Sequence, residues 1–226
     1  MASDAVYLSV APLYHAAALG YATNPHFVGG TTVFMRKFDA EAALHCIERD
    51  GITHSQWVPT MFVRMLKLPD DVRERHDLSS HRVAIHAAAP CPVEVKQRMI
   101  DWWGPILTEY YSGTEANGLT VIDSAQAMRK PGSVGQAVVG TLHISGDDGA
   151  ELPAGEDGQV YFARELQPFR YHKDEAKTRA AQHPRHPNWT TLGDMGHVDA
   201  DGYLFLVDRK DFMIISGGVN IYPQAV

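Results

Sequence analysis

The chain has 226 residues, of which 45% are hydrophobic and 21% are charged, and its formal net charge is −7. This composition is typical of a soluble globular protein that is long enough to bury a substantial core. The acidic balance, with lysine and arginine scattered along the chain, argues against nucleic acid or an anionic membrane surface as a partner. The sequence has no apolar run of membrane-spanning length and no visible signal peptide, so we expect a cytoplasmic protein.

The cysteines and histidines indicate no covalent or metal framework. The two cysteines, Cys46 and Cys91, are too few for a disulfide scaffold and suit a reducing compartment. The twelve histidines are dispersed. His183 and His186 share a proline-rich loop, but no cysteine stands at zinc-site spacing, which favours a solvated loop over a metal site.

The first half of the chain alternates strand and helix patterns. Apolar or β-branched runs predict strands over 6–10, 31–35, 53–58, 82–86 and 106–110. Helical periodicity follows three of these runs, at 40–49, from Thr60 onward and at 93–103. Asp39 and Thr60 are the expected N-caps, and Gly51 and Gly104 the expected stops. Repeated alternation of this kind predicts a mostly parallel sheet with covering helices.

The second half has a different texture. Short β-branched runs between 135 and 164 are separated by turn clusters at 146–149 and 153–158, which predicts a small antiparallel, β-barrel-like subdomain. A polar, mobile connection is expected over 165–188. A tight turn at 199–202 then leads into another strand.

We therefore predict an α/β fold in three parts. The predicted parts are an incomplete α/β nucleotide-binding subdomain (1–124), a β-rich subdomain with a ribose-binding turn (125–208), and a hinge that begins a further domain (209–226).

The segment from Tyr111 to Glu115 follows a predicted strand, where α/β sheets bind ligands. Ser112 and Gly113 let the backbone approach a ligand, and Thr114 offers a donor to a phosphate oxygen. Glu115 suits Mg²⁺, which takes few protein carboxylates together with phosphate oxygens. For the pentapeptide alone, an ordinary strand-to-helix turn is an equally good reading.

Three further elements have the chemistry of a nucleotide site, and a histidine follows the first strand. The small loop Ala87-Ala88-Ala89-Pro90 suits a planar base, and Asp194, in a glycine-bounded turn, suits ribose hydroxyls. Arg209 offers a fork of donors, and His15 follows the first strand. Taken singly, each of these is more simply a structural residue.

Taken together and in this order, the elements resemble the acyl-CoA synthetases of the adenylate-forming superfamily. The resemblance runs from about residue 6 to the end, and its texture is closest to fatty-acyl or carnitine-type CoA ligases. It implies an ATP-dependent acid–CoA ligase, in which a carboxylate and ATP give an acyl-adenylate and pyrophosphate, and CoA then takes the acyl group. The implied ligands are ATP or AMP, Mg²⁺, CoA and a small carboxylic acid.

The resemblance also implies a role for each quoted residue. The nucleotide-binding residues it implies are Ala87, Ala88 and Ala89 for adenine, Tyr111 for base stacking, Ser112, Gly113 and Thr114 for phosphate, Glu115 for Mg²⁺, and Asp194 and Arg209 for ribose. The remaining implied residues are His15 at the carboxylate and acyl tunnel, Asp211 as the hinge, and Trp57, Val58 and Pro59 near the acyl pocket.

The sequence departs from the family pattern in several places. Leu192 stands where the family often has serine or threonine, and Thr191 is the expected substitute; Ser112-Gly113 inverts the commoner order. The glycine-rich phosphate loop and the C-terminal domain, each with its lysine, are missing from these 226 residues. We expect a partial ligase, with a non-catalytic nucleotide-binding remnant or a domain that loads a carrier protein as alternatives. An exposed sheet edge is also expected to favour self-association or a homo-oligomer.

The missing lysines generate a prediction. Loss of one positioned donor typically costs about 10²–10³ in rate, so residues 1–226 alone are expected to show negligible ligase activity. The measurement is exchange of radiolabelled pyrophosphate into ATP with a panel of acids. Exchange above background with any acid would contradict this prediction.

Overall fold

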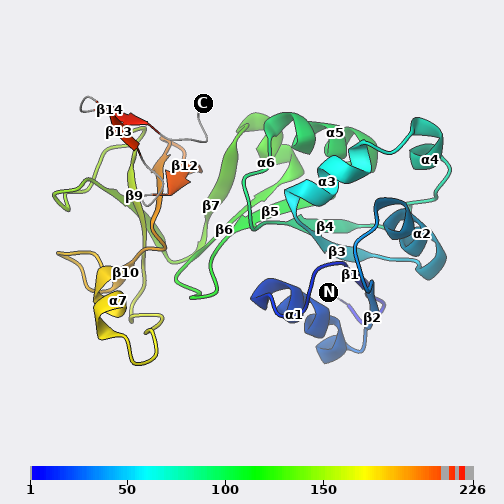
Figure 1. The fold of residues 1–226 in the computed structure, drawn as a ribbon, viewed down its shortest axis with the longest axis horizontal. Helices are drawn as coiled ribbons and strands as arrows, with labels where there is room; N and C mark the ends of the chain where they lie inside the picture. The colour runs from blue at the N-terminus through cyan, green and yellow to red at the C-terminus, as the bar shows by residue number, and fades with distance from the viewer. Residues whose placement is uncertain (1, 210–213, 217–218, 222–226) are drawn as a thin grey trace. The chain divides into compact units, whose positions relative to one another are not determined.

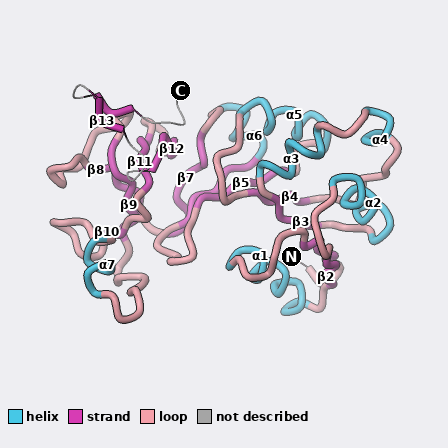
Figure 2. The backbone as a smooth tube through the Cα atoms, viewed as in Figure 1, coloured by secondary structure: helices cyan, strands magenta, loops and turns pink. Residues whose placement is uncertain are grey.

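The computed structural model describes residues 2–209, 214–216 and 219–221 (Figure 1). The chain divides into two compact units, Met1–Glu109 with Asp123–Gly132 and Tyr110–Ile122 with Ser133–Val226. Helices surround the strands of the first unit, whereas the second consists mainly of strands and loops (Figure 2). Among the described residues, no helix is long and apolar enough to cross a membrane.

The first unit is built on parallel strands in the order β2-β1-β3-β4-β5. These strands are β1 (Val6–Ser9), β2 (Thr31–Phe34), β3 (His54–Trp57), β4 (Val83–His86) and β5 (Leu107–Tyr111). The register pairs Trp57 with His86, and His86 with Glu109. The carboxyl ends of three strands therefore meet at one edge, and the predicted parallel arrangement is confirmed.

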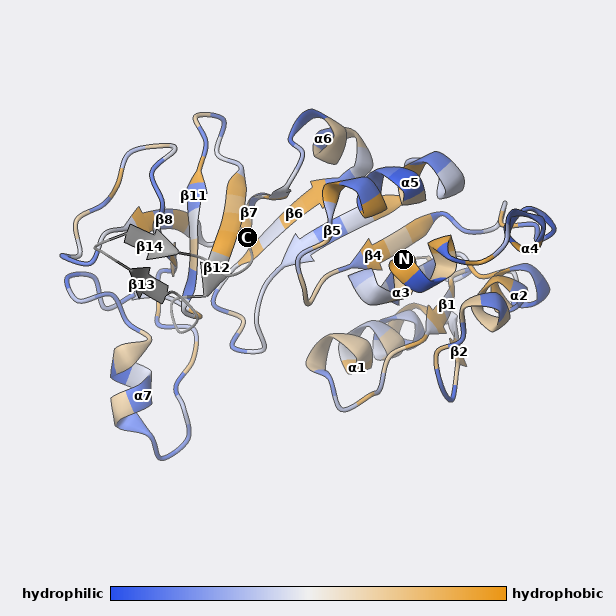
Figure 3. Ribbon diagram, turned by 45° about the horizontal axis from the view of Figure 1, so that its top comes forward, coloured by the Kyte–Doolittle hydropathy of each residue, from blue (hydrophilic) through white to orange (hydrophobic). Residues whose placement is uncertain are grey.

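Helices cover these parallel strands. They are α1 (Ala16–Thr23), the 3-10 helix η1 (Asn24–Val28), α2 (Ala40–Asp50), α3 (Pro59–Leu66), α4 (Asp70–Glu74), α5 (Val93–Trp103) and α6 (Ser124–Arg129). In Figure 1, α3 and α5 lie on one side of β3 and β4, and α1 lies on the other. The core between them includes Leu44, Trp57 and Phe62, all fully buried. Figure 3 shows β4 as largely apolar and β5 as mixed, in keeping with Thr108 and Glu109 in the middle of β5.

Local chemistry determines where two helices of this unit begin or end. Asp39 caps α2 by accepting a hydrogen bond from the Ala42 amide at 3.0 Å, and Gly51 ends the helix at φ 61°, as predicted. The prediction that Thr60 caps the next helix is wrong. Helix α3 begins at Pro59 and so includes Thr60, and its N-cap residue, Val58, makes no side-chain hydrogen bond to the helix. Proline suits the first helical position because its missing N–H would have no helical partner there.

The second unit consists of antiparallel strands in the order β10-β9-β11-β12-β7-β6, with β8 also paired to β9. The strands are β6 (Leu119–Asp123), β7 (Ser133–Val139), β8 (Thr141–Ser145), β9 (Gly158–Ala163), β10 (Trp189–Thr190), β11 (Asp194–Val198) and β12 (Leu204–Arg209). A separate hairpin pairs β13 (Ile214–Ser216) with β14 (Val219–Ile221). The predicted α/β class, parallel first and antiparallel second, is confirmed.

Two expectations for the second unit are wrong. The segment 165–188 contains a helix, α7 (Glu175–Ala180), because Asp174 caps it by accepting from the Lys177 amide at 2.9 Å. His183 is also not solvated, since its residue is only 3% exposed. Its Nδ1 accepts from the amides of Arg185 and His186, and its ring packs on Trp189. Polar composition suggested solvent, but these local hydrogen bonds allow the ring to be buried.

A buried polar group lies at the carboxyl ends of β4 and β5. The Lys96 ammonium forms an ion pair with Glu109, and both side chains are buried. Burial raises the pKa of the Glu109 carboxyl, although Lys96 opposes that rise. Nδ1 of His86 lies 3.9 Å from Glu109, too far for a hydrogen bond, and neither ring nitrogen of His86 has a hydrogen-bond partner. Burial, and then the nearby Lys96 charge, lower the pKa of His86 to about 3.

His86 therefore makes stability dependent on pH. In the unfolded chain this histidine takes a proton below about pH 6.5, whereas in the folded chain it stays neutral down to about pH 3. Its contribution is fully present above pH 6.5 and is lost as the pH falls towards 3. The unfolding free energy of the parent is expected to fall when the pH is lowered from 7.5 to 5.0. In His86→Leu we expect this fall to be smaller by about 2 kcal/mol.

Urea denaturation at the two pH values measures this difference. His26→Leu, at an exposed position of the same unit, is the matched control. Equal losses in the parent and in His86→Leu would show that this histidine does not set the acid sensitivity.

Candidate nucleotide site

A hydrogen bond joins two predicted site residues that lie far apart in the sequence. The Tyr111 hydroxyl donates to Oδ2 of Asp194 at 2.6 Å. Tyr111 is the last residue of β5, and Asp194 is the first residue of β11. The register of β11 with β12 places the backbone of Arg209 opposite Asp194. The fold of the second unit therefore brings Tyr111, Asp194 and the Arg209 position together.

The Tyr111 ring is supported by the core of the second unit. It stacks on Phe162 with ring centroids 6.2 Å apart and planes 28° apart, and Phe162 is 1% exposed. Gly118 lies against the same phenyl ring, because a Cβ built on it would be 2.0 Å from Phe162. A glycine at this position allows Phe162, and with it Tyr111, to occupy these places.

The loop from Ser112 to Glu115 is closed by its own hydrogen bonds. Ser112 Oγ donates to the Gly118 carbonyl at 2.7 Å, and the Ala116 amide donates to the Gly113 carbonyl at 3.1 Å. Ala116 takes a left-handed φ of 52°, which is uncommon for a residue with a side chain. A Cβ on Gly113 would lie 2.6 Å from Leu192 and 3.0 Å from Glu115. The loop therefore passes close to the turn that precedes Asp194, and Thr114 is exposed at its tip.

Glu115, the predicted magnesium ligand, is held by a tyrosine that sequence reasoning missed. The Tyr171 hydroxyl donates to Oε1 of Glu115 at 2.9 Å. Burial, and then this bond to the carboxylate, raise the pKa of Tyr171 to about 12. The Lys177 ammonium lies 4.1 Å from the centre of the Tyr171 ring. Nothing in the local pattern at Tyr171 could have indicated a partner 56 residues away.

The turn before Asp194 is organised by Thr191. Its hydroxyl oxygen accepts from the Gly193 amide at 3.0 Å and from the Gln159 side chain at 3.3 Å. Gly193 takes φ 87°, a conformation that favours glycine. Thr191 thus supplies a hydroxyl beside the Asp194 turn. The family often has serine or threonine at the position of Leu192, and Thr191 is the residue expected to substitute for it.

The remaining predicted residues belong to the first unit or fall outside the described residues. Ala87, Ala88 and Ala89 follow β4; Ala87 is buried and the other two are exposed. Ala88 has a φ of 77°, and such left-handed strain in a residue with a side chain is frequent at functional sites. His15 is exposed at the start of α1. Asp211, the predicted hinge, lies outside the described residues.

Comparison with known proteins identifies the family. The family model described as AMP-binding enzyme matches residues 1–168. The chain therefore belongs to the AMP-binding enzyme family, and the resemblance inferred from its motifs is confirmed. Its homologues include acid–CoA ligases, so the ligase class of the family is also confirmed.

Individual relatives match the whole chain but only part of their own length. It is 36% identical to a feruloyl-CoA synthase of an Amycolatopsis species over 100% of this chain and 45% of that protein. It is 34% identical to an indoleacetate–CoA ligase of Aromatoleum aromaticum, over 100% of this chain and 44% of that protein. The chain thus spans less than half the length of these curated relatives.

Two solved structures illustrate the similarity of fold. The amide bond synthetase McbA from Marinactinospora thermotolerans superposes with a TM-score of 0.86 at 26% identity, over 99% of this chain and 45% of that chain. ATP-bound MatB from Rhodopseudomonas palustris superposes with a TM-score of 0.83 at 27% identity, over 99% of this chain and 44% of that chain.

The contact between Gly118 and Phe162 generates a prediction. Gly118→Ala would force the buried ring to move, and overpacking of this kind typically costs about 1–3 kcal/mol. We expect the unfolding free energy to fall by that amount in urea denaturation.

Gly20→Ala is the control, because a Cβ there would have no atom within 4 Å. It is expected to leave stability unchanged or slightly higher, since alanine favours the helix. A Gly118→Ala variant as stable as Gly20→Ala would contradict the close packing of Gly118 against Phe162, the residue that supports the Tyr111 ring.

Proposed function

We propose that this chain carries the AMP site of an ATP-dependent acid–CoA ligase. In that reaction an oxygen of the acid attacks the α-phosphorus of ATP, and pyrophosphate leaves to give an acyl-adenylate. The thiol of CoA then attacks the acyl carbon, and AMP leaves. Family membership supports the proposal, and the contact between Tyr111 and Asp194 is the observation that carries it to particular residues.

Asp194 and Tyr111 hold the nucleoside in this proposal. A carboxylate that accepts from two vicinal hydroxyls is a common way to hold a ribose. The bond from the Tyr111 hydroxyl orients the Asp194 carboxylate, while Phe162 fixes the plane of the Tyr111 ring, which stacks on adenine. Arg209, opposite Asp194 in the strand register, donates to the same ribose.

Thr114 and Glu115 serve the phosphates. The chemistry of Glu115 fits Mg²⁺, because this ion takes one or two protein carboxylates and completes its shell with phosphate oxygens and water. Glu115 would hold the ion, which neutralises phosphate charge when bound. Tyr171 positions the Glu115 carboxylate by its hydrogen bond to Oε1. The exposed Thr114 hydroxyl donates to a phosphate oxygen.

Residues of the first unit also have roles in this proposal, as the family resemblance implies. Ala87, Ala88 and Ala89 lie against the base, and the left-handed Ala88 fixes the path of their backbone. His15 lies at the entrance for the acid, and the segment from Trp57 to Pro59 borders its apolar part. An aryl-substituted acid is the proposed substrate class, since the two curated relatives described above act on feruloyl and indoleacetate groups by name.

Calorimetric titration of AMP into the chain tests the site. Asp194→Asn is expected to weaken AMP binding at least tenfold, because a hydrogen bond to a charged group contributes about 1.5–3 kcal/mol. Asp201→Asn, on an exposed turn of the same unit, is the matched control. AMP affinity equal in the parent and in Asp194→Asn would remove the proposed ribose contact.

The acid class is tested separately with stable acyl-adenylate mimics. A mimic carrying an aryl group should bind more tightly than one carrying a long alkyl chain. The reverse order would refute the aryl-acid assignment and leave the AMP site intact.

A further inference from the structure

A second cluster of ligand-type side chains lies in the first unit and has no part in the proposed nucleotide site. It consists of His45 and Glu48 on α2 and His76 in the segment after α4. One nitrogen or oxygen atom from each residue can be chosen such that the three atoms all lie within 4.8 Å of one another. In the described part of the chain this is the only such group of three or more.

Helix geometry and a tertiary contact together build the cluster. His45 and Glu48 are three residues apart and so share one face of α2. Glu48 then fixes the segment after α4, because its Oε2 contacts Nδ1 of His76 at 2.8 Å and its Oε1 accepts from the Asp77 amide at 3.3 Å. Two of the three ligand groups, Glu48 and His76, are therefore held together before any ion binds.

His76 is the buried member of the cluster. Its side chain is 8% exposed, and its Nε2 atom is buried without a hydrogen-bond partner. The His45 ring lies with its centroid 6.3 Å from that of His76. Nδ1, the other ring nitrogen of His76, contacts Glu48 and is the nitrogen that the cluster offers to an ion.

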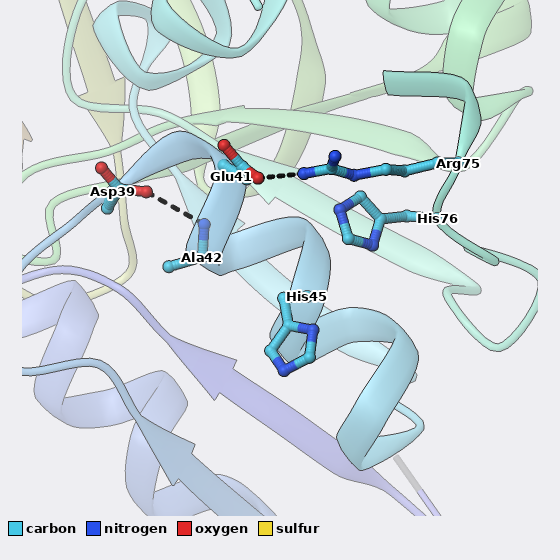
Figure 4. A pocket seen from close by; sticks show the side chains of 6 residues that line it. All are labelled: Asp39, Glu41, Ala42, His45, Arg75 and His76. Carbon is cyan, nitrogen blue, oxygen red and sulfur yellow. Dashed lines mark hydrogen bonds and ion pairs between the residues drawn. The ribbon is translucent and has the colours of Figure 1, made fainter. Parts of the chain in front are cut away.

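The two histidines of the cluster border a surface pocket. Figure 4 shows His45 and His76 on its wall, with Glu41 and Arg75 beside them. The Arg75 guanidinium is paired with Glu41, so its positive charge is compensated. The pocket has a volume of about 510 Å³, which is ample for an ion with its water molecules.

We propose that His45, Glu48 and His76 bind a divalent first-row transition ion, with Zn²⁺ as the representative ion. Imidazole nitrogens select zinc and its neighbours over Mg²⁺ or Ca²⁺, which prefer all-oxygen sites. Two histidines and a carboxylate are an established zinc donor set that leaves a fourth position for water. The ion would take the place of the hydrogen shared by His76 Nδ1 and Glu48 Oε2. Bonds of 2.0–2.1 Å in a tetrahedron place ligand atoms about 3.4 Å apart. Nδ1 of His76 and Oε2 of Glu48 would therefore separate slightly from 2.8 Å, and ligand atoms that lie up to 4.8 Å apart would approach one another.

Zinc titration of the full chain, first stripped with a chelator, tests the proposal. Calorimetry with ZnCl₂ is expected to show one saturable equivalent. His45→Ala should weaken zinc binding by at least about 10–100-fold, the loss typical when even a group that only supports a ligand is removed, and Glu48→Gln should also weaken zinc binding. His45 is exposed on α2, and alanine favours a helix, so this variant is expected to remain folded.

His26→Ala is the matched control, since His26 is an exposed histidine of the same unit outside the cluster. A second readout is the melting temperature, which zinc should raise in the parent and in His26→Ala but not in His45→Ala. Absence of a saturable equivalent in the parent, or equal zinc affinity in the parent and in His45→Ala, would overturn the proposal.

Discussion

The hydrogen bond from Tyr111 to Asp194 is the contact on which the proposed site depends. It joins the end of a parallel strand to the start of an antiparallel strand, and it spans 83 residues of sequence. Several local features hold its two partners. Phe162 supports the tyrosine ring, Gly118 leaves room for Phe162, and Thr191 shapes the turn into Asp194. A change at any of these places would alter the geometry offered to a ribose without touching the nucleotide itself.

Both carboxylates of the proposed site accept a hydrogen bond from a tyrosine hydroxyl. Tyr111 donates to Asp194, and Tyr171 donates to Glu115. A carboxylate has two oxygens with about four acceptor positions, so one such bond can orient the group without exhausting its capacity. Preorganised groups need less rearrangement when charge develops on a bound phosphate. This arrangement gives Tyr171 a positioning role, although it lies in a segment whose composition predicted only a connection.

The first unit combines a packed aromatic core with strained or polar features at the carboxyl ends of its strands. Lys96 and Glu109 pair in the interior, His86 stays neutral beside them, and Ala88 takes a left-handed conformation directly after β4. Such features cost stability, and they persist only where the surrounding packing is strong enough to hold them. Their position next to the proposed adenine loop is where an α/β sheet places its ligands. The cluster at His45 is a separate matter, since it depends on α2 and the segment after α4 alone.

Sequence by itself determined the family and most of the first unit. Its strands and the ends of α2 and α5 followed from apolar periodicity, Asp39 and glycine stops, because these signals act within a few residues. The order of the motifs identified the AMP-binding family. Only the tertiary structure decided which side chains meet, as Tyr171 meets Glu115 and His76 meets Glu48. It also decided that the buried ring nitrogens of His86 have no hydrogen-bond partner. The two contacts join residues 56 and 28 positions apart, and the state of His86 depends on its complete burial. Local patterns do not encode which distant segment arrives at a given place.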